Sequence, residues 1–169
     1  MNSMLILLLS SLLLTGAGPK SGAKESAGLK WTNFTEGVRE AKATNKKVLI
    51  DVYTNWCGWC KKMESDTYSD QGVKDYLVRN FVLVKLNAES NAEETIDTTQ
   101  ITDAQIASAF RVNGYPTTIF LESGGQPITA APGYMGPAKF LKVLEYIGGD
   151  FYKKMGFEQF LKSKGVTAE

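Results

Sequence analysis

Histidine is absent from this 169-residue sequence, and cysteine occurs only twice, at Cys57 and Cys60. The lack of histidine excludes Ser-His and Cys-His catalysis, imidazole metal ligands and a histidine pH switch. Two cysteines cannot form a four-cysteine zinc site within one chain, and they are too few for the disulfide framework of a small secreted scaffold. We therefore predict no metal site.

A strong excess of one charge is also lacking, because the net charge is +1 and both signs are interspersed. The sequence therefore gives no electrostatic reason to expect binding to nucleic acid or to an anionic membrane surface. The length and a hydrophobic content of 43% instead indicate one globular domain, which we expect to be a monomer.

No apolar run reaches the 20 or so residues that a membrane-spanning helix needs. The main run, Leu5–Leu14, is followed by small residues at 15–18 that suit cleavage. Residues 1–18 are therefore predicted to be a signal peptide, although no Lys or Arg precedes the run, and an uncleaved anchor is the main alternative. Residues 19–29 are expected to be a flexible spacer. This predicts a periplasmic or secreted protein with no membrane contact after cleavage of the leader.

The spacing of apolar residues predicts a mixed sheet with helices on both faces, because strands joined through helices favour parallel pairing and a hairpin adds antiparallel strands. Residues 87–102 are polar and acidic, and we expect a loop or a partly helical insertion with solvated carboxylates. The expected strands span 48–53, 81–86, 117–121 and 127–131, and the expected helices span 33–44, 56–66, 70–79, 103–111, a stretch from 136–137 onward, and 156–163.

The two cysteines are three positions apart, so a disulfide between them closes almost no loop and adds little stability. Redox chemistry is therefore favoured over a structural disulfide or half of a zinc site, which remain alternatives. They lie where a helix is expected to begin after a strand, so unpaired N–H groups and the helix dipole stabilise a thiolate at Cys57. Cys60 lies one turn further on, close enough to form the disulfide.

The segment from Asp51 to Lys61, DVYTNWCGWCK, resembles the active-site segment of the thioredoxin family. The resemblance covers roughly residues 30–148 and implies an α/β thioredoxin fold, with a thioredoxin-like domain over 30–169. The further matching positions are Asp51 six residues before Cys57, Trp56 beside the motif, Lys85 in a strand, the Tyr115-Pro116-Thr117 loop and Gly133.

The resemblance implies that Cys57 attacks a substrate disulfide and that Cys60 resolves the mixed disulfide. Asp51 completes the implied catalytic set by helping to deprotonate Cys60, directly or through water. Lys85 supports the site, and the redox-active disulfide replaces any cofactor. The implied substrate-binding residues are Trp56, Gly58, Trp59, Tyr115 and Pro116, with Pro116 in cis.

Plainer interpretations stay open for several of these residues. Asp51 is alternatively a tolerated strand-end carboxylate, and Lys85 a solvated strand residue. Pro116 is alternatively an ordinary trans turn residue. The two tryptophans and Tyr115 also fit general hydrophobic packing.

Common thioredoxins have proline where this chain has Trp59, and the residues between the cysteines tune the redox potential in that family. The segment from Trp59 to Glu64, followed by Tyr68-Ser69-Asp70, is similar to secreted bacterial thioredoxin-like proteins and to the C-terminal domain of membrane thiol–disulfide interchange reductases. This implies reduction of protein disulfides outside the cytoplasm, with an upstream thiol–disulfide electron donor. An oxidase or isomerase, or a non-catalytic binding or chaperone module, is the alternative.

Residues 87–102 follow a strand parallel to the one that ends before Cys57. The carboxyl ends of parallel strands share one edge of a sheet, where sites usually form. We therefore expect this segment to border the active face and to contribute to the choice of partner.

Overall fold

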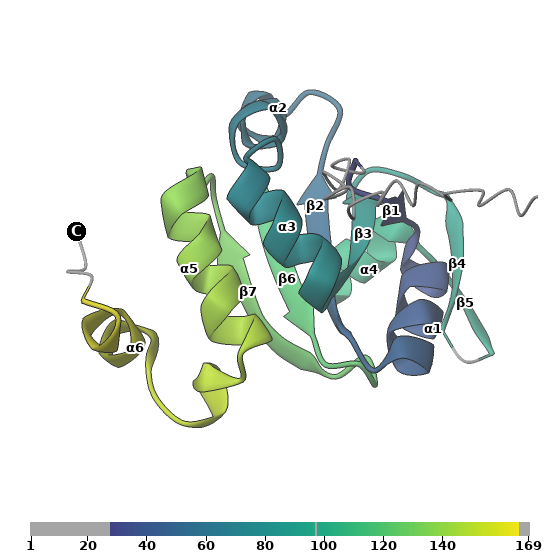
Figure 1. Ribbon diagram of the computed structural model, residues 1–169. Helices are drawn as coiled ribbons and strands as arrows, with labels where there is room; N and C mark the ends of the chain where they lie inside the picture. The colour runs from purple at the N-terminus through teal and green to yellow at the C-terminus, as the bar shows by residue number, and fades with distance from the viewer. Residues whose placement is uncertain (1–27, 97, 166–169) are drawn as a thin grey trace, which may run out of the picture.

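A five-stranded sheet with the order β1-β3-β2-β6-β7 forms the centre of the fold (Figure 1). β1, β3 and β2 are parallel, while β6 pairs antiparallel with β2 and with β7. The predicted mixed sheet is thus confirmed, with the short first strand as an addition. The strands are β1 (Trp31–Thr32), β2 (Lys47–Tyr53), β3 (Phe81–Asn87), β6 (Thr117–Leu121) and β7 (Pro127–Pro132).

The computed structural model describes residues 28–96 and 98–165. The expected signal peptide, residues 1–18, and most of the expected spacer lie outside the described residues. Within the described ranges, no helix combines the length and the apolar character that crossing a bilayer requires.

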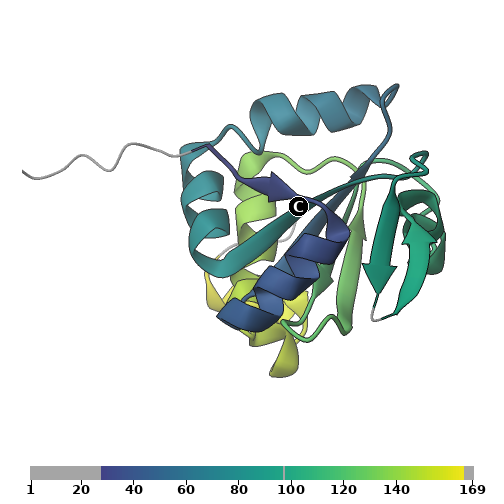
Figure 2. The ribbon, with the colours of Figure 1, turned by 90° about the vertical axis from the view of Figure 1, so that its right-hand side faces the viewer.

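Helices cover both faces of the sheet, as the sequence predicted. The helices α1 (Phe34–Thr44) and α4 (Asp103–Ala109) pack on one face. The opposite face carries α2 (Gly58–Asp66), α3 (Gln71–Asn80) and α5 (Pro137–Gly148), and Figure 1 shows α3 and α5 side by side. A 3-10 turn (Phe151–Lys153) and α6 (Phe157–Ser163) follow α5. The view in Figure 2 shows α2 across one end of the sheet.

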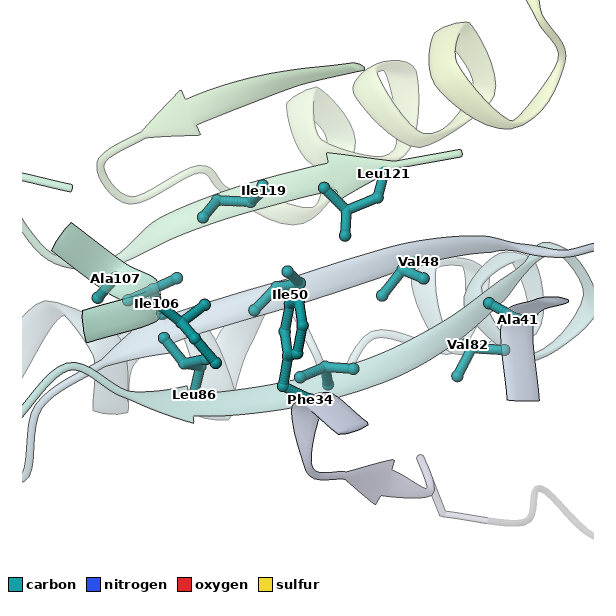
Figure 3. Close-up of a cluster of buried hydrophobic side chains, with 12 residues drawn as sticks. Phe34, Ala41, Val48, Ile50, Val82, Leu86, Ile106, Ala107, Ile119 and Leu121 are labelled. Atoms are coloured by element: carbon teal, nitrogen blue, oxygen red, sulfur yellow. The ribbon is translucent and has the colours of Figure 1, made fainter. Parts of the chain in front are cut away.

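β2 is buried on both faces, so its apolar residues form a nearly continuous run. Successive side chains point to opposite faces of a strand. Val48, Ile50 and Val52 therefore pack toward α1 and α4, in the core layer shown in Figure 3. Leu49 faces α3 and α5 instead, and Asp51 shares its side of the strand. This alternation places a carboxylate in the apolar layer beneath α2.

The segment 87–102 is the expected loop only over residues 88–92, and most of the residues after it are in strands. β4 (Glu93–Ile96) and β5 (Thr99–Thr102) pair antiparallel as a separate two-stranded sheet. β-branched Thr and Ile residues are frequent here and favour extended backbone over helix. Thr102 is the N-cap of α4, since its side chain accepts a hydrogen bond from the backbone N–H of Gln105.

Glu94 in β4 is buried, so the expectation that all the acids of this segment are solvated was wrong. Its carboxylate accepts hydrogen bonds from the backbone N–H groups of Phe34 (3.3 Å) and Thr35 (2.8 Å), and from the Thr35 hydroxyl. The first N–H groups of a helix lack intrahelical partners. Glu94 thus caps α1 from a strand 60 residues away and attaches the β4–β5 hairpin to it.

Glu94→Gln is expected to lower the free energy of unfolding by about 2 kcal/mol, since a neutral amide replaces a charged acceptor at a helix N-terminus. Denaturant unfolding measures this loss, and amide exchange should accelerate at Phe34 and Thr35. Glu93→Gln is the matched control, because Glu93 is exposed in the same strand. Equal stabilities of the two variants would contradict the assigned cap.

Candidate active site

Cys57 and Cys60 form a disulfide at the beginning of α2, just beyond the carboxyl end of β2. Cys57 is the N-cap residue, and its Sγ accepts a hydrogen bond from the backbone N–H of Cys60 at 3.0 Å. In the reduced state the same N–H group and the helix dipole favour a thiolate at Cys57. The structure thus brings the two predicted cysteines together in the geometry that activates the first of them.

Two large aromatic side chains flank the disulfide and remain exposed, Trp56 at 66% and Trp59 at 59%. Trp56 meets Tyr115 edge-on, with ring centroids 5.9 Å apart, while Trp59 lies 5.4 Å from the ring of Tyr134. Gly58 lies between the tryptophans, and a Cβ there would meet no atom within 4 Å. The disulfide is therefore surrounded by an aromatic surface that is open to a partner.

The loop before β6 supplies Tyr115 and Pro116, which are joined by a cis peptide bond. The backbone N–H of Gly133 donates to the Pro116 carbonyl oxygen at 2.8 Å, and Gly133 has a φ of 84°, a conformation that favours glycine. The next residue, Tyr134, donates its hydroxyl to Asp66 Oδ2 at 3.1 Å. These bonds fix Tyr134 beside Trp59, although sequence reasoning did not include Tyr134 in the site.

Asp51 is only 2% exposed and forms an ion pair with Lys85, whose Nζ lies 2.7 Å from Asp51 Oδ2. The two residues are register partners in β2 and β3, and Thr118 of β6 is the partner of Asp51 on its other side. Burial raises the pKa of Asp51, and the Lys85 ammonium opposes that shift. Lys85 is thus the partner of a buried carboxylate, and its predicted supporting role in the site stays a prediction.

Two further residues belong to this buried cluster. Glu64 Oε2 lies 3.7 Å from Lys85 Nζ, and Tyr68 is 4% exposed with its hydroxyl beside Asp51. Burial raises the pKa of Tyr68 well above its usual value. The sequence carried a signal for Glu64, since it lies four residues after Cys60 on the same face of α2. Nothing in the spacing of Tyr68 pointed to Asp51.

A cavity of about 130 Å³ connects the second cysteine with this cluster. Cys60 and Lys85 both line its wall, so solvent-sized molecules fit between the buried sulfur and the ion pair. The other lining residues are Tyr53, Thr54, Asn55, Lys61 and Glu64.

The segment after β3 also contacts Trp56, the residue that precedes Cys57. Trp56 Nε1 donates a hydrogen bond to Glu89 Oε1 at 2.9 Å. The beginning of the 87–102 segment therefore contacts the exposed tryptophan, while the β4–β5 hairpin contacts α1 through Glu94. The expected role of this segment in the choice of partner stays a prediction.

These features define a dithiol–disulfide redox site on a mixed α/β sheet. The sequence pattern of the thioredoxin-like domain family matches residues 34–148. Over 107 residues the chain is 36% identical to the thiol:disulfide interchange protein DsbD of Yersinia pestis. That match covers 62% of this chain and 16% of the relative, so the chain spans less than a fifth of that protein's length.

Solved structures show the same fold. A thioredoxin from Thermus thermophilus aligns with a TM-score of 0.59 at 26% identity, over 72% of this chain and 88% of that one. A thioredoxin-fold protein from Helicobacter pylori gives a TM-score of 0.63 at 24% identity, over 72% and 80% of the two chains.

The chain belongs to the thioredoxin-like domain family, and the predicted thioredoxin fold is confirmed. Family membership and the Cys57–Cys60 pair together support a thiol–disulfide oxidoreductase, as the sequence predicted.

Proposed function

We propose that the chain reduces protein disulfides outside the cytoplasm through a dithiol–disulfide cycle of Cys57 and Cys60, with no further cofactor. The observation that carries this proposal is the position of the pair. It lies at a helix N-terminus between two exposed tryptophans, with a buried carboxylate and its lysine partner behind it. Such a site combines an activated thiol, an open docking surface and a proton acceptor.

The cycle begins with the reduced pair. The Cys57 thiolate attacks one sulfur of a substrate disulfide, and the other substrate sulfur leaves as a thiolate. Cys60 then loses its proton and attacks Cys57 Sγ, which breaks the mixed disulfide and releases the second substrate sulfur. The substrate gains two electrons, and the pair loses them as it returns to the disulfide. An upstream dithiol donor restores the reduced pair by the reverse steps.

Asp51 is the proposed acceptor of the Cys60 proton, directly or through water. Its raised pKa, caused mainly by burial, brings the carboxylate closer to the pKa of a thiol. The cavity that Cys60 and Lys85 share supplies the route, since it leads from the sulfur to the ammonium that contacts Asp51. Lys85 keeps Asp51 ionised until the proton arrives.

The substrate is proposed to bind as an extended segment across the aromatic surface. The Tyr115 backbone beside the cis peptide pairs with that segment, while Trp56, Gly58, Trp59 and Pro116 form the surrounding contact area. Aromatic side chains of this kind often dominate docking energies. The chain acts as a monomer in this proposal, with protein thiols and disulfides as its partners.

Two lines of support favour a reducing role outside the cytoplasm. The apolar leader of the sequence resembles a signal peptide, and the chain is similar to a thiol:disulfide interchange protein over 107 residues. Trp59, which stands in the place of the proline of common thioredoxins, leaves the direction open, so an oxidase or isomerase on the same fold is the second candidate.

A redox titration of the full chain in buffers of graded glutathione potential distinguishes these functions. A reductase is expected to equilibrate near the value of about −270 mV known for thioredoxin, and an oxidase near about −120 mV. Trp59→Pro restores the common thioredoxin residue, so the difference between the two potentials gives the contribution of Trp59 to the redox potential of the pair. A potential close to −120 mV in the unaltered chain would overturn the reducing direction.

A further inference from the structure

Three aromatic rings surround the Lys85 ammonium beneath the disulfide. Its Nζ lies 4.8 Å from the ring centroid of Trp31, 5.2 Å from that of Tyr53 and 5.7 Å from that of Tyr68. All three distances fall within the 6 Å or so at which a ring attracts a cation. The rings come from β1, from the end of β2 and from the residues after α2, and we call them the Lys85 cage.

The position of the cage is fixed by the core. Trp31 meets Tyr68 edge-on at 5.0 Å, and Tyr68 meets Phe140 of α5 edge-on at 5.6 Å. Tyr68 and Phe140 are both buried. The cage therefore cannot follow a moving lysine, and it restricts the flexible Lys85 side chain to the position in which its ammonium contacts Asp51.

Three buried oxygen atoms lie on the same side of the sheet without a hydrogen-bond partner among the described residues. They are Asp51 Oδ1, the Tyr68 hydroxyl and the Thr118 hydroxyl. Thr118 is the register partner of Asp51, and the Tyr68 hydroxyl lies near both. A buried polar group that has no hydrogen-bond partner lowers the stability of the fold. A tyrosine at this position thus carries a stability cost that a phenylalanine would avoid, which points to a use for its hydroxyl.

We propose that Trp31 and Tyr68 are positioning residues for the resolving step. The cage holds the Lys85 ammonium against one oxygen of Asp51, and the Tyr68 hydroxyl beside the carboxylate is available to donate a hydrogen bond to the other. Asp51 is thereby kept ionised and free to accept a proton. This inference rests on the proposed function, because it concerns the proton that Cys60 must lose.

The step is balanced within the site. The Cys60 S–H bond breaks, its proton binds the Asp51 carboxylate, and its electron pair forms the bond to Cys57 Sγ. The bond between Cys57 and the substrate sulfur breaks at the same time, and that sulfur leaves with the bonding electron pair. The dithiol is oxidised by two electrons and the substrate disulfide is reduced by two.

The charges around Asp51 explain why the cage matters. Lys85 faces it from β3, and Glu64 approaches the same ammonium from α2, with a side chain that is 63% exposed. The Tyr68 and Thr118 hydroxyls are the neutral groups on the remaining sides. Without the cage, Lys85 can turn toward Glu64 and solvent. Asp51 would then be buried without its cation and would bind a proton at a higher pH.

The test is a ¹³C NMR titration of the Asp51 carboxyl in the reduced full chain, combined with the pH dependence of Cys60 alkylation. Trp31→Leu and Tyr68→Phe are each expected to raise the Asp51 midpoint by about one pH unit, a tenfold change in its ionisation constant. Trp31→Phe keeps an aromatic face and should restore most of the unaltered midpoint. The alkylation profile of Cys60 should shift in the same direction.

Tyr146→Phe is the matched control, since it removes a hydroxyl that donates to the Met155 carbonyl at 2.7 Å, at the α5–α6 side of the molecule. It should leave the Asp51 midpoint unchanged. Unshifted midpoints in Tyr68→Phe and Trp31→Leu would overturn the inference. A shift in Trp31→Phe as large as that in Trp31→Leu, or an equal shift in Tyr146→Phe, would overturn it as well. The titration needs no substrate, so a chain that titrates as expected but reduces no protein disulfide contradicts the proposed function alone.

Discussion

Cys57→Ser is expected to reduce the turnover of protein disulfides to the uncatalysed level, whereas Cys60→Ser should trap the substrate. A serine hydroxyl is not ionised at neutral pH, so it cannot use the stabilisation that the Cys60 N–H and the N-terminus of α2 give to a thiolate. Cys60→Ser keeps the attacking thiol and removes the resolving one. Mixed disulfides should therefore accumulate on Cys57.

Non-reducing electrophoresis with mass spectrometry measures both results in cells that express each variant. The double variant Cys57→Ser, Cys60→Ser is the control and should form no adduct. The captured partners also show in which compartment the chain works. A Cys57→Ser variant with full biological activity would instead support the binding or chaperone alternative and contradict the redox cycle.

Asp51→Asn is expected to slow resolution by about 100-fold, in line with the loss of a proton acceptor, while it stabilises the fold. Burial raises the pKa of Asp51 despite the contact with Lys85, so the ionised carboxylate costs stability in the folded state. Removal of that charge should increase the free energy of unfolding by about 1–2 kcal/mol at pH 7, since Lys85 keeps the Glu64 carboxylate as an anionic neighbour at 3.7 Å.

The pH dependence of the stability gained in Asp51→Asn follows from the direction of the Asp51 pKa shift. The folded state holds the Asp51 proton to a higher pH than the unfolded state, whose pKa is near 3.8. The stability of the unaltered chain, relative to Asp51→Asn, should fall as the pH rises from about 3.8 through the folded pKa and stay constant above it. Urea unfolding at several pH values measures this difference. Single-turnover decay of a mixed disulfide measures the rate. A variant that is less stable and equally fast would contradict the role given to Asp51.

Local sequence features were sufficient to predict most of the fold. β2 and β6 are rich in apolar and β-branched residues, and α1 and α3 have apolar residues at helical spacing, so their bounds agree with the predictions to within one residue. The predicted start of α5 at 136–137 agrees as well. The β4–β5 hairpin escaped prediction because its strands are short, polar and mostly exposed. Strands of that kind show little alternation of apolar and polar residues.

The part of the candidate site that lies within one short sequence motif could be predicted. Cys57, Cys60 and Trp56 are nearly adjacent in the chain, and Asp51 and Lys85 become neighbours through strand register. Tyr68 and Tyr134 were missed because their partners are set by tertiary packing. Tyr134 reaches Trp59 only because Gly133 turns the chain against Pro116. Glu94 likewise reaches α1 across 60 residues, a contact that no local pattern indicates.

The two exposed tryptophans and Tyr115 gather around a single disulfide. In the proposed cycle, a substrate and an electron donor therefore use the same surface and the same sulfur. They cannot be bound together, so the chain exchanges electrons with one partner before it meets the next. The expected kinetic order is a double displacement, in which each partner competitively inhibits the half-reaction of the other. The rate of electron transfer from donor to substrate then depends on the ratio of the two partners as well as on their amounts.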